Sequence, residues 1–171
     1  IVLNRPEKLN ALTFEMYARI GELLGELDTD PGTRVVVLRG EGRAFSTGFD
    51  LGAREESLSL EARRERVFRV ANANRWRIWG LTKPVVAKLQ GYCMAGALEM
   101  VLPCDFIIAS EDCQLGEPEV LFGAGPAFLS VPWLVWVHRA KDILMTGRRF
   151  TGKEAADWGL SAKPGAVSQV V

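Results

Sequence analysis

The chain has 171 residues, of which 48% are apolar and 25% are charged, and this composition is typical of a soluble globular domain with a substantial core. Its 21 basic residues balance 21 acidic residues, so the basic excess of most nucleic-acid-binding proteins is absent. No apolar run reaches the roughly 18 residues of a membrane-spanning helix. We therefore expect no nucleic-acid partner, no membrane insertion and a cytoplasmic location, or a mitochondrial-matrix location if a leader was removed.

Apolar runs alternate with helical patterns in the first half of the chain, which favours an α/β fold in one domain. Residues 1–3 have the character of a strand end, and Thr13 is a predicted N-cap. The β-branched run at residues 35–38 predicts a strand covered on both faces, and residues 60–80 predict a charged helix. The apolar residues that follow Thr13 keep to one helical face, and they are Met16, Ile20, Leu23, Leu24 and Leu27.

The second half continues this alternation and ends in a capped helix. Thr151 and Glu154 have the spacing of a capping box, which predicts a short helix through Trp158. Aromatic residues at helical spacing are usually core residues, and we interpret Phe128, Trp133 and Trp136 in this way. The other predicted elements are strands at residues 84–89 and 105–109, a short helix at 96–102, a loop at 116–125 and a helix at 132–145.

The residue types offer no metal or covalent-nucleophile site of recognised spacing. Cys93, Cys104 and Cys113 form no CxxC pair, and His138 cannot complete a zinc site with them. We therefore interpret the cysteines as buried packing residues and expect no metal. A serine hydrolase would need this single histidine as its base, and no G-x-G-x-x-G segment follows the first strand to support a dinucleotide enzyme.

Two glycine-containing junctions follow predicted strands, at residues 45–50 and 91–97. Small residues allow the backbone to approach a ligand closely, and the first N–H groups of a helix have no intrahelical partner. Two such junctions at neighbouring strands could direct two N–H donors at one oxygen, as in an oxyanion hole. Ordinary tight turns are the alternative explanation.

Acidic residues occur in apolar surroundings near these junctions. Glu99 belongs to an otherwise apolar helical stretch, and burying a carboxylate without a partner is costly. Glu119 follows a proline and lies between apolar neighbours, and two carboxylates facing one pocket could divide acid and base roles. The alternative is that Glu99 faces solvent and that Glu117 and Glu119 are surface charges.

Six segments of the chain match one known pattern in both order and spacing, and they are residues 3–12, 44–51, 83–99, 104–109, 116–119 and 146–160. In these segments the chain resembles the enoyl-CoA hydratase/isomerase (crotonase) family. The resemblance implies a crotonase-like spiral of ββα turns with a mixed sheet, a single core domain over residues 1–171, and a C-terminal helical tail that is missing or incomplete beyond residue 160.

The resemblance also implies roles for individual residues. The backbone N–H groups of Phe49 and Gly96 align with the oxyanion donors, Glu119 with the carboxylate that exchanges a proton with Cα, and Glu99 with the one that helps activate water. The coenzyme A thioester is then the substrate, and no separate cofactor is expected. The residues that align with coenzyme A contacts are Lys8, Asn10, Ala11, Leu12, Phe45, Thr47, Asp50 and Leu51.

Some positions depart from the family pattern. Ala95 and Ala97 stand where glycines are frequent, and Phe49 replaces a commoner alanine, so its ring could narrow the acyl pocket. Gly52 stands where a phosphate-contacting lysine is frequent, and Arg54 is a candidate substitute. Both acidic positions are occupied, which favours a hydratase. The alternatives are an isomerase or related CoA-thioester enzyme, and a noncatalytic acyl-CoA binder. Family members usually form trimers or hexamers, so we expect a homo-oligomer.

Overall fold

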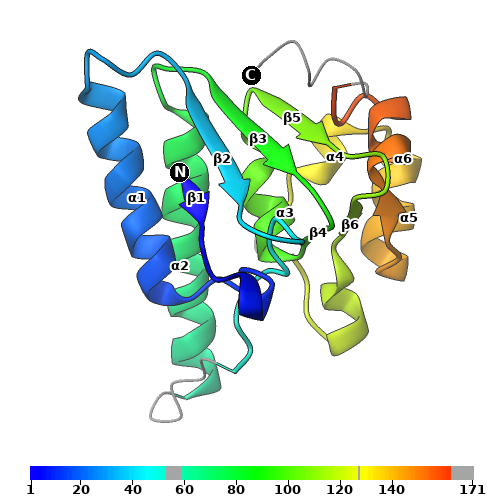
Figure 1. Ribbon diagram of the computed structural model, residues 1–171. Coiled ribbons are helices and arrows are strands. Elements are labelled where there is room, and N and C mark those ends of the chain that lie inside the picture. The colour runs from blue at the N-terminus through cyan, green and yellow to red at the C-terminus, as the bar shows by residue number, and fades with distance from the viewer. Residues whose placement is uncertain (53–58, 127, 163–171) are drawn as a thin grey trace.

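The computed structural model describes residues 1–52, 59–126 and 128–162, and a four-stranded parallel sheet forms its centre (Figure 1). Its strands lie in the order β1, β2, β3 and β5, with Val36 opposite Val85 and Val86 opposite Phe106. The predicted strands at the N-terminus and in the middle of the chain are therefore confirmed. Their bounds are Val2–Leu3 for β1, Val36–Gly40 for β2, Val85–Leu89 for β3 and Phe106–Ala109 for β5.

A second sheet contains three short strands that the sequence patterns did not predict. They are β4 (Tyr92–Met94), β6 (Gln114–Gly116) and β7 (Phe150–Thr151). Strand β6 lies between the other two, parallel to β4 and antiparallel to β7. Strands β3 and β5 belong to the parallel sheet, and the strands that follow them, β4 and β6, belong to the second sheet. Each of these two β–β units therefore contributes one strand to each sheet. Helix α3 (Gly96–Val101) follows β4 directly, as a ββα turn requires.

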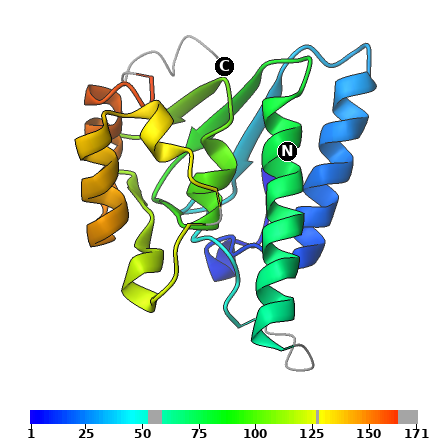
Figure 2. The ribbon, with the colours of Figure 1, turned by 180° about the vertical axis from the view of Figure 1, so that it is seen from behind.

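Two long helices pack together beside the parallel sheet. Helix α1 (Phe14–Thr29) begins at Thr13, whose side chain accepts a hydrogen bond from the N–H of Met16 as predicted. Helix α2 (Leu60–Trp79) confirms the predicted charged helix. Helices α2 and α3 lie behind the sheet in Figure 1 and in front of it in Figure 2.

The opposite face of the parallel sheet is open in the described residues. Val37 on β2 is 41% exposed and Phe106 on β5 is 58% exposed. The prediction that residues 35–38 are covered on both faces was therefore wrong. Continuous β-branched runs indicate a strand with two covered faces, but the described helices supply a cover for only one.

Short helices complete the described chain, and two predictions needed correction there. Instead of a loop, residues 116–125 contain the 3-10 helix η2 (Pro118–Phe122). Instead of one helix, residues 132–145 are divided between α4 (Val131–Leu134) and α5 (Val137–Thr146), because Val135 has an extended backbone. The predicted capping box at Thr151 and Glu154 is confirmed and begins α6 (Gly152–Asp157). A helix η1 (Pro6–Lys8) precedes α1.

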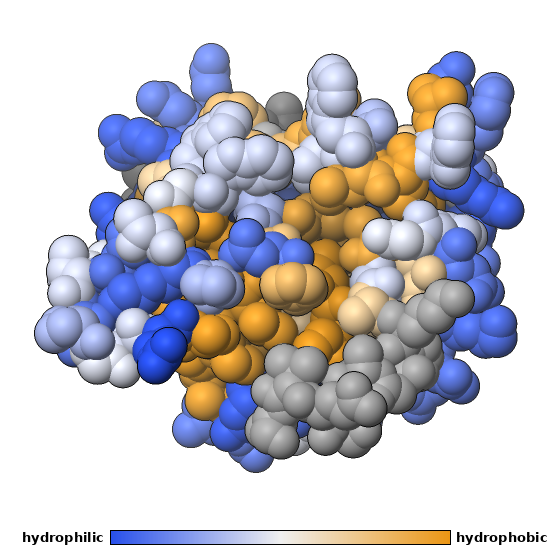
Figure 3. Space-filling view, turned by 90° about the horizontal axis from the view of Figure 1, so that it is seen from above, coloured by the Kyte–Doolittle hydropathy of each residue, from blue (hydrophilic) through white to orange (hydrophobic). Residues whose placement is uncertain are grey.

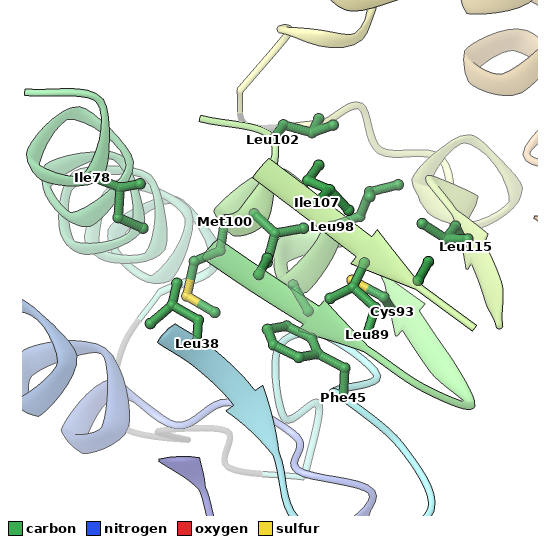
Figure 4. Close-up of a cluster of buried hydrophobic side chains, with 14 of the residues drawn as sticks. Leu38, Phe45, Ile78, Leu89, Cys93, Leu98, Met100, Leu102, Ile107 and Leu115 are labelled. Carbon is green, nitrogen blue, oxygen red and sulfur yellow. The ribbon is translucent and has the colours of Figure 1, made fainter. Parts of the chain in front are cut away.

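The core lies where the sheets meet α2 and α3, and it fixes α3 in place (Figure 4). Leu98 and Met100 of α3 are at most 1% exposed and pack with Leu38 and Leu89 of the parallel sheet. Cys93 is also fully buried, as the packing interpretation predicted. Dense packing of this kind resists displacement, so Gly96 and Glu99 on the same helix have a rigid support.

The surface carries a considerable amount of apolar area. Trp133 and Trp136 are 87% and 83% exposed, so their interpretation as core residues was wrong for the described structure. Apolar residues also cover a broad area in the middle of the face seen in Figure 3, with polar residues around it. No helix in the described segments combines the length and apolar character needed to cross a bilayer.

Candidate active site

The two glycine-containing junctions lie side by side, as the oxyanion-hole hypothesis requires. The N–H of Ser46 donates to the carbonyl of Tyr92 at 2.9 Å, and the N–H of Met94 donates to the carbonyl of Ser46 at 3.1 Å. On the other side of the same loop, Leu12 donates to Gly48 at 2.8 Å and accepts from Asp50 at 2.9 Å. These bonds hold the first junction between the second junction and the segment after η1.

Two backbone donors remain unused at this point. Among the hydrogen bonds of the described residues, none is donated by the N–H of Phe49 or of Gly96. Gly48 has φ +91, and a Cβ placed on it would lie 3.5 Å from the amide nitrogen of Gly96 and 2.9 Å from the carbonyl oxygen of Met94. Only glycine allows this approach without a clash. The arrangement offers two N–H groups from adjacent backbones to a single acceptor.

Ala95 occupies an unusual backbone conformation between these donors. Its φ is 54 and its ψ is −135, a region that residues with a Cβ rarely adopt. Ala95 occupies one of the positions at which glycine is frequent in the family that the chain resembles. The chain therefore retains the glycine-like backbone here despite the added methyl group.

Glu99 is buried and has partners, which excludes the alternative that it faces solvent. Its side chain is 2% exposed and forms an ion pair with Arg75 of α2, which is 1% exposed. Its second oxygen accepts a hydrogen bond from the N–H of Phe128 at 2.8 Å. Burial of a charge is tolerated when it is paired and hydrogen bonded.

Glu117 and Glu119 complete a cluster of three carboxyl groups. Oxygen atoms of Glu99, Glu117 and Glu119 lie within 4.8 Å of one another. Glu117 is 1% exposed, which excludes the alternative that it is a surface charge, and Glu119 is half-buried. Burial raises the pKa of Glu119 above its usual range. Burial, together with the charges of Glu99 and Glu119, holds the pKa of Glu117 well above its usual range.

A cavity of about 1160 Å³ opens over the cluster and the two free donors. Its volume is sufficient for a small-molecule ligand. Six of the predicted site residues line it, namely Thr47, Phe49, Leu51, Gly96, Glu99 and Glu119. Its other lining residues include Leu9, Tyr17, Arg43, Phe68, Arg75, Tyr92, Met94, Ala95, Pro118, Phe122, Gly123, Ala124, Gly125, Pro126 and Arg149.

The remaining predicted coenzyme A contacts do not line the cavity, and some of them hold neighbouring loops together. The side-chain amide of Asn10 donates to the carbonyls of Ala44 at 2.8 Å and Glu41 at 2.9 Å. Asp50 pairs with Arg5. The other members of this set are Lys8, Ala11, Leu12 and Phe45, and Leu12 and Phe45 are fully buried. Arg54, the suggested substitute for a phosphate-contacting lysine, lies outside the described residues, as does the chain from residue 163 onward.

Sequence reasoning missed several residues of the site. Arg75 and Tyr17 belong to long helices whose spacing gave no sign that they would reach the cavity. The hydroxyl of Tyr17 donates to the carbonyl of Gly96 at 3.4 Å, and burial raises the pKa of this phenol. Arg43 and Arg149 add two exposed cations to the cavity wall. Neither could have been distinguished from ordinary surface charges without the fold.

The three carboxyl groups are the one set in the described segments close enough to hold a metal ion together. However, the guanidinium of Arg75 is already bonded to Glu99 and places a fixed positive charge beside them. One oxygen of Glu99 is bonded to Arg75 and the other accepts the N–H of Phe128, so both are already engaged. We therefore assign these residues no metal.

Comparisons with known proteins agree with this fold. The family model described as enoyl-CoA hydratase/isomerase matches residues 1–171. A putative enoyl-CoA hydratase of Thermus thermophilus is 37% identical over 94% of the chain and 64% of its own length. A mevalonyl-coenzyme A hydratase of Aspergillus fumigatus is 36% identical over 94% of the chain and 60% of its own length. The chain thus spans less than two thirds of these relatives.

Solved structures give the same result. The crystal structure of an enoyl-CoA hydratase/isomerase from Xanthobacter autotrophicus superimposes with a TM-score of 0.87 and 40% identity, over 94% of this chain and 60% of that one. An enoyl-CoA hydratase from Bacillus anthracis superimposes with a TM-score of 0.87 and 32% identity, over 94% and 63% of the two chains. The predicted crotonase-like α/β fold is confirmed, and the chain belongs to the enoyl-CoA hydratase/isomerase family.

Proposed function

We propose that this chain is the catalytic core of an enoyl-CoA hydratase, which adds water syn to a trans-2-enoyl-CoA and forms a 3-hydroxyacyl-CoA. The observation that carries the proposal is the arrangement of Glu99 and Glu119 on the wall of one cavity with the backbone of Phe49 and Gly96. Both N–H groups at that wall are free of other partners among the described residues. Relatives named as hydratases support the same reaction.

The mechanism follows from these positions. The thioester oxygen accepts hydrogen bonds from the N–H groups of Phe49 and Gly96, which stabilise the negative charge that develops as the enolate forms. Glu99 removes a proton from water while the water oxygen bonds to Cβ. Glu119 delivers a proton to Cα, where the electron pair of the double bond ends. The proton on Glu99 then returns to Glu119, so one water molecule is consumed and both carboxyl groups regain their initial states.

The electrostatics of the cavity suit these roles. Arg75 stabilises the negative charge on Glu99, and a general base must be ionised to accept a proton. The raised pKa of Glu119 keeps a proton available for Cα at higher pH than an exposed glutamate would allow. At the cavity wall, Arg43 and Arg149 are placed to attract the phosphates of coenzyme A.

An isomerase that moves a double bond is the second candidate. A dienoyl-CoA isomerase of Arabidopsis thaliana is 30% identical over 95% of the chain. Proton transfer between two carbons needs one carboxylate, whereas this cavity presents two, one of them held by a buried arginine. We therefore favour hydration, and a noncatalytic binder would have no use for either group.

The test is the loss of conjugated-enoyl absorbance when the full-length protein is mixed with a short trans-2-enoyl-CoA. We expect rapid loss, and we expect Glu99→Gln and Glu119→Gln each to reduce kcat by about 100-fold or more. Glu22→Gln, on the exposed face of α1, is the matched control and retains the native rate. Acyl-CoA binding without absorbance loss would instead support an isomerase or a noncatalytic binder, and full activity of Glu119→Gln would refute the assigned role.

A homo-oligomer, expected as a trimer or hexamer, remains part of the proposal. Large exposed apolar areas commonly mark protein–protein interfaces, and Trp133 and Trp136 contribute such an area here. Sedimentation of the full-length protein measures the assembly directly.

A further inference from the structure

Glu117 is a buried carboxyl group without a fixed donor. It is 1% exposed, and neither of its oxygens receives a hydrogen bond from an N–H or hydroxyl group in the described part of the chain. It does not line the cavity, although Pro118 and Glu119 do. A buried carboxylate with no donor is costly, so its protonation state must be explained by its neighbours.

The neighbours of Glu117 contain more negative than positive charge. Arg75 is the cation among them, and its guanidinium is bonded to Glu99. Glu119 has no such partner, and its carboxyl group lies close enough to that of Glu117 for a hydrogen bond once one of them carries a proton. The titratable and charged groups that face Glu117 are Tyr17 from α1, Arg75 from α2, Cys93 from β4, Glu99 from α3 and Glu119 from η2.

Two carboxyl groups at this distance in a buried site do not ionise together at ordinary pH, because their repulsion is poorly screened. The pKa values of both groups are raised, so Glu119 can still hold the proton that it delivers to Cα, and the directions of the shifts indicate that Glu117 holds its own proton more firmly. The bond between them raises the pKa of Glu117 and lowers that of Glu119. Glu117 is also the more deeply buried of the two.

We propose that Glu117 is a positioning residue that retains a proton and donates it as a hydrogen bond to Glu119, which holds the Glu119 carboxyl group toward the cavity. The proposal rests on the hydratase function proposed above, because Glu119 is the group that exchanges a proton with Cα. Glu117 itself does not touch the substrate. Its contribution is the direction in which Glu119 points and the pH range over which Glu119 keeps that direction.

The first test measures the proton itself and does not depend on activity. Infrared spectra of the full-length protein at neutral pH should show the C=O stretch of a protonated carboxylic acid. Glu117→Gln should remove this band, whereas Glu119→Gln should shift it, because only the acceptor changes. Absence of the band, or its loss in Glu119→Gln with retention in Glu117→Gln, would overturn the proposal.

The second test measures the effect on Glu119 through kinetics. Glu117→Met fills similar space but donates no hydrogen bond, and we expect kcat to fall by up to about 100-fold with little change in KM. Glu117→Gln retains a hydrogen-bond donor that does not titrate. We therefore expect the decrease in kcat to be at least tenfold smaller than in Glu117→Met. We also expect the alkaline limb of the pH–rate profile to move to higher pH. A purely structural role predicts equal effects of both variants and an unchanged profile, and that result would overturn the proposal.

The two proposals fail in different ways. If the native full-length protein hydrates no enoyl-CoA but shows the band assigned to Glu117, the hydratase function fails and the proton assignment stands. If it hydrates enoyl-CoA but lacks the band, the hydratase function stands and the role of Glu117 fails. Thermal unfolding of each variant confirms that it is folded before either result is used.

Discussion

The guanidinium of Arg75 in α2 is bonded to the carboxylate of Glu99 in α3, and both side chains are at most 2% exposed. This pair joins a long helix to the helix that begins at Gly96, the proposed oxyanion donor. It therefore links the stability of the fold to the orientation of a proposed catalytic group. Arg75 also lines the cavity, so its charge also acts on the interior of the cavity.

Removing the cation should be costly for folding. Arg75→Met leaves Glu99 buried without its charged partner, and we expect the free energy of unfolding to fall by about 3–5 kcal/mol, measured by urea denaturation. The matched control is Arg19→Met, which removes an exposed arginine from its pairs with Glu22 and Glu26. We expect no measurable change there, because exposed ion pairs contribute little. Equal effects of the two variants would contradict the role assigned to the buried pair.

Ala95 provides a test of backbone strain. Its positive φ of 54 costs energy in any residue with a Cβ. Glycine removes this cost but makes the unfolded chain more flexible. The net expectation is that Ala95→Gly raises the free energy of unfolding by about 1 kcal/mol. Ala97→Gly is the control, since Ala97 is a buried position inside α3. There the same substitution should destabilise the protein by about 1 kcal/mol. A loss of stability in both variants would show that Ala95 is not strained.

Phe49 should restrict the size of the acyl group. Its ring lines the cavity and packs edge-on against Phe14 at 4.9 Å and stacks on Tyr17 at 6.3 Å. Phe49→Ala enlarges the cavity, and we expect kcat/KM for longer acyl groups to rise relative to a four-carbon substrate by about tenfold. Phe14→Ala removes the ring behind Phe49 without removing the cavity wall. Equal shifts in selectivity would show that Phe49 does not set the limit.

The raised pKa of Glu117 should make folding stability depend on pH. The folded protein retains this proton above the ordinary value of 4.5, whereas the unfolded chain releases it. The folded state therefore binds more protons, and the free energy of unfolding falls as pH rises from 4.5 toward the folded pKa.

Glu117→Gln removes this dependence, because an amide does not titrate. Its stability relative to the native protein should increase with pH by up to about 1.4 kcal/mol per pH unit. Urea denaturation between about pH 5 and pH 8 measures the difference. Parallel curves for the native protein and the variant would contradict the raised pKa, and Glu22→Gln controls for the loss of one exposed carboxylate.

The sequence alone determined the elements whose signals are local. Helix α1 begins at Thr13 and the capping box begins α6, because a cap is formed by residues three positions apart. The parallel strands were also predicted, since each begins with a run of apolar residues. The burial of Glu99 could be inferred as one of two alternatives, because a lone carboxylate in an apolar helix demands a partner.

Only the tertiary structure decided which residues come together in the site. Arg75 and Glu99 are 24 positions apart in the sequence, and no periodicity connects them. The short strands β4, β6 and β7 were missed because three or fewer residues carry no periodic signal. Backbone bonds between Ser46 and β4 bring Gly48 beside Gly96. The pairing of β4 with β6 brings α3, which carries Glu99, beside Glu117 and Glu119. Whether a carboxyl group keeps its proton depends on those neighbours and on exclusion from water, and both arise only when distant parts of the chain pack together.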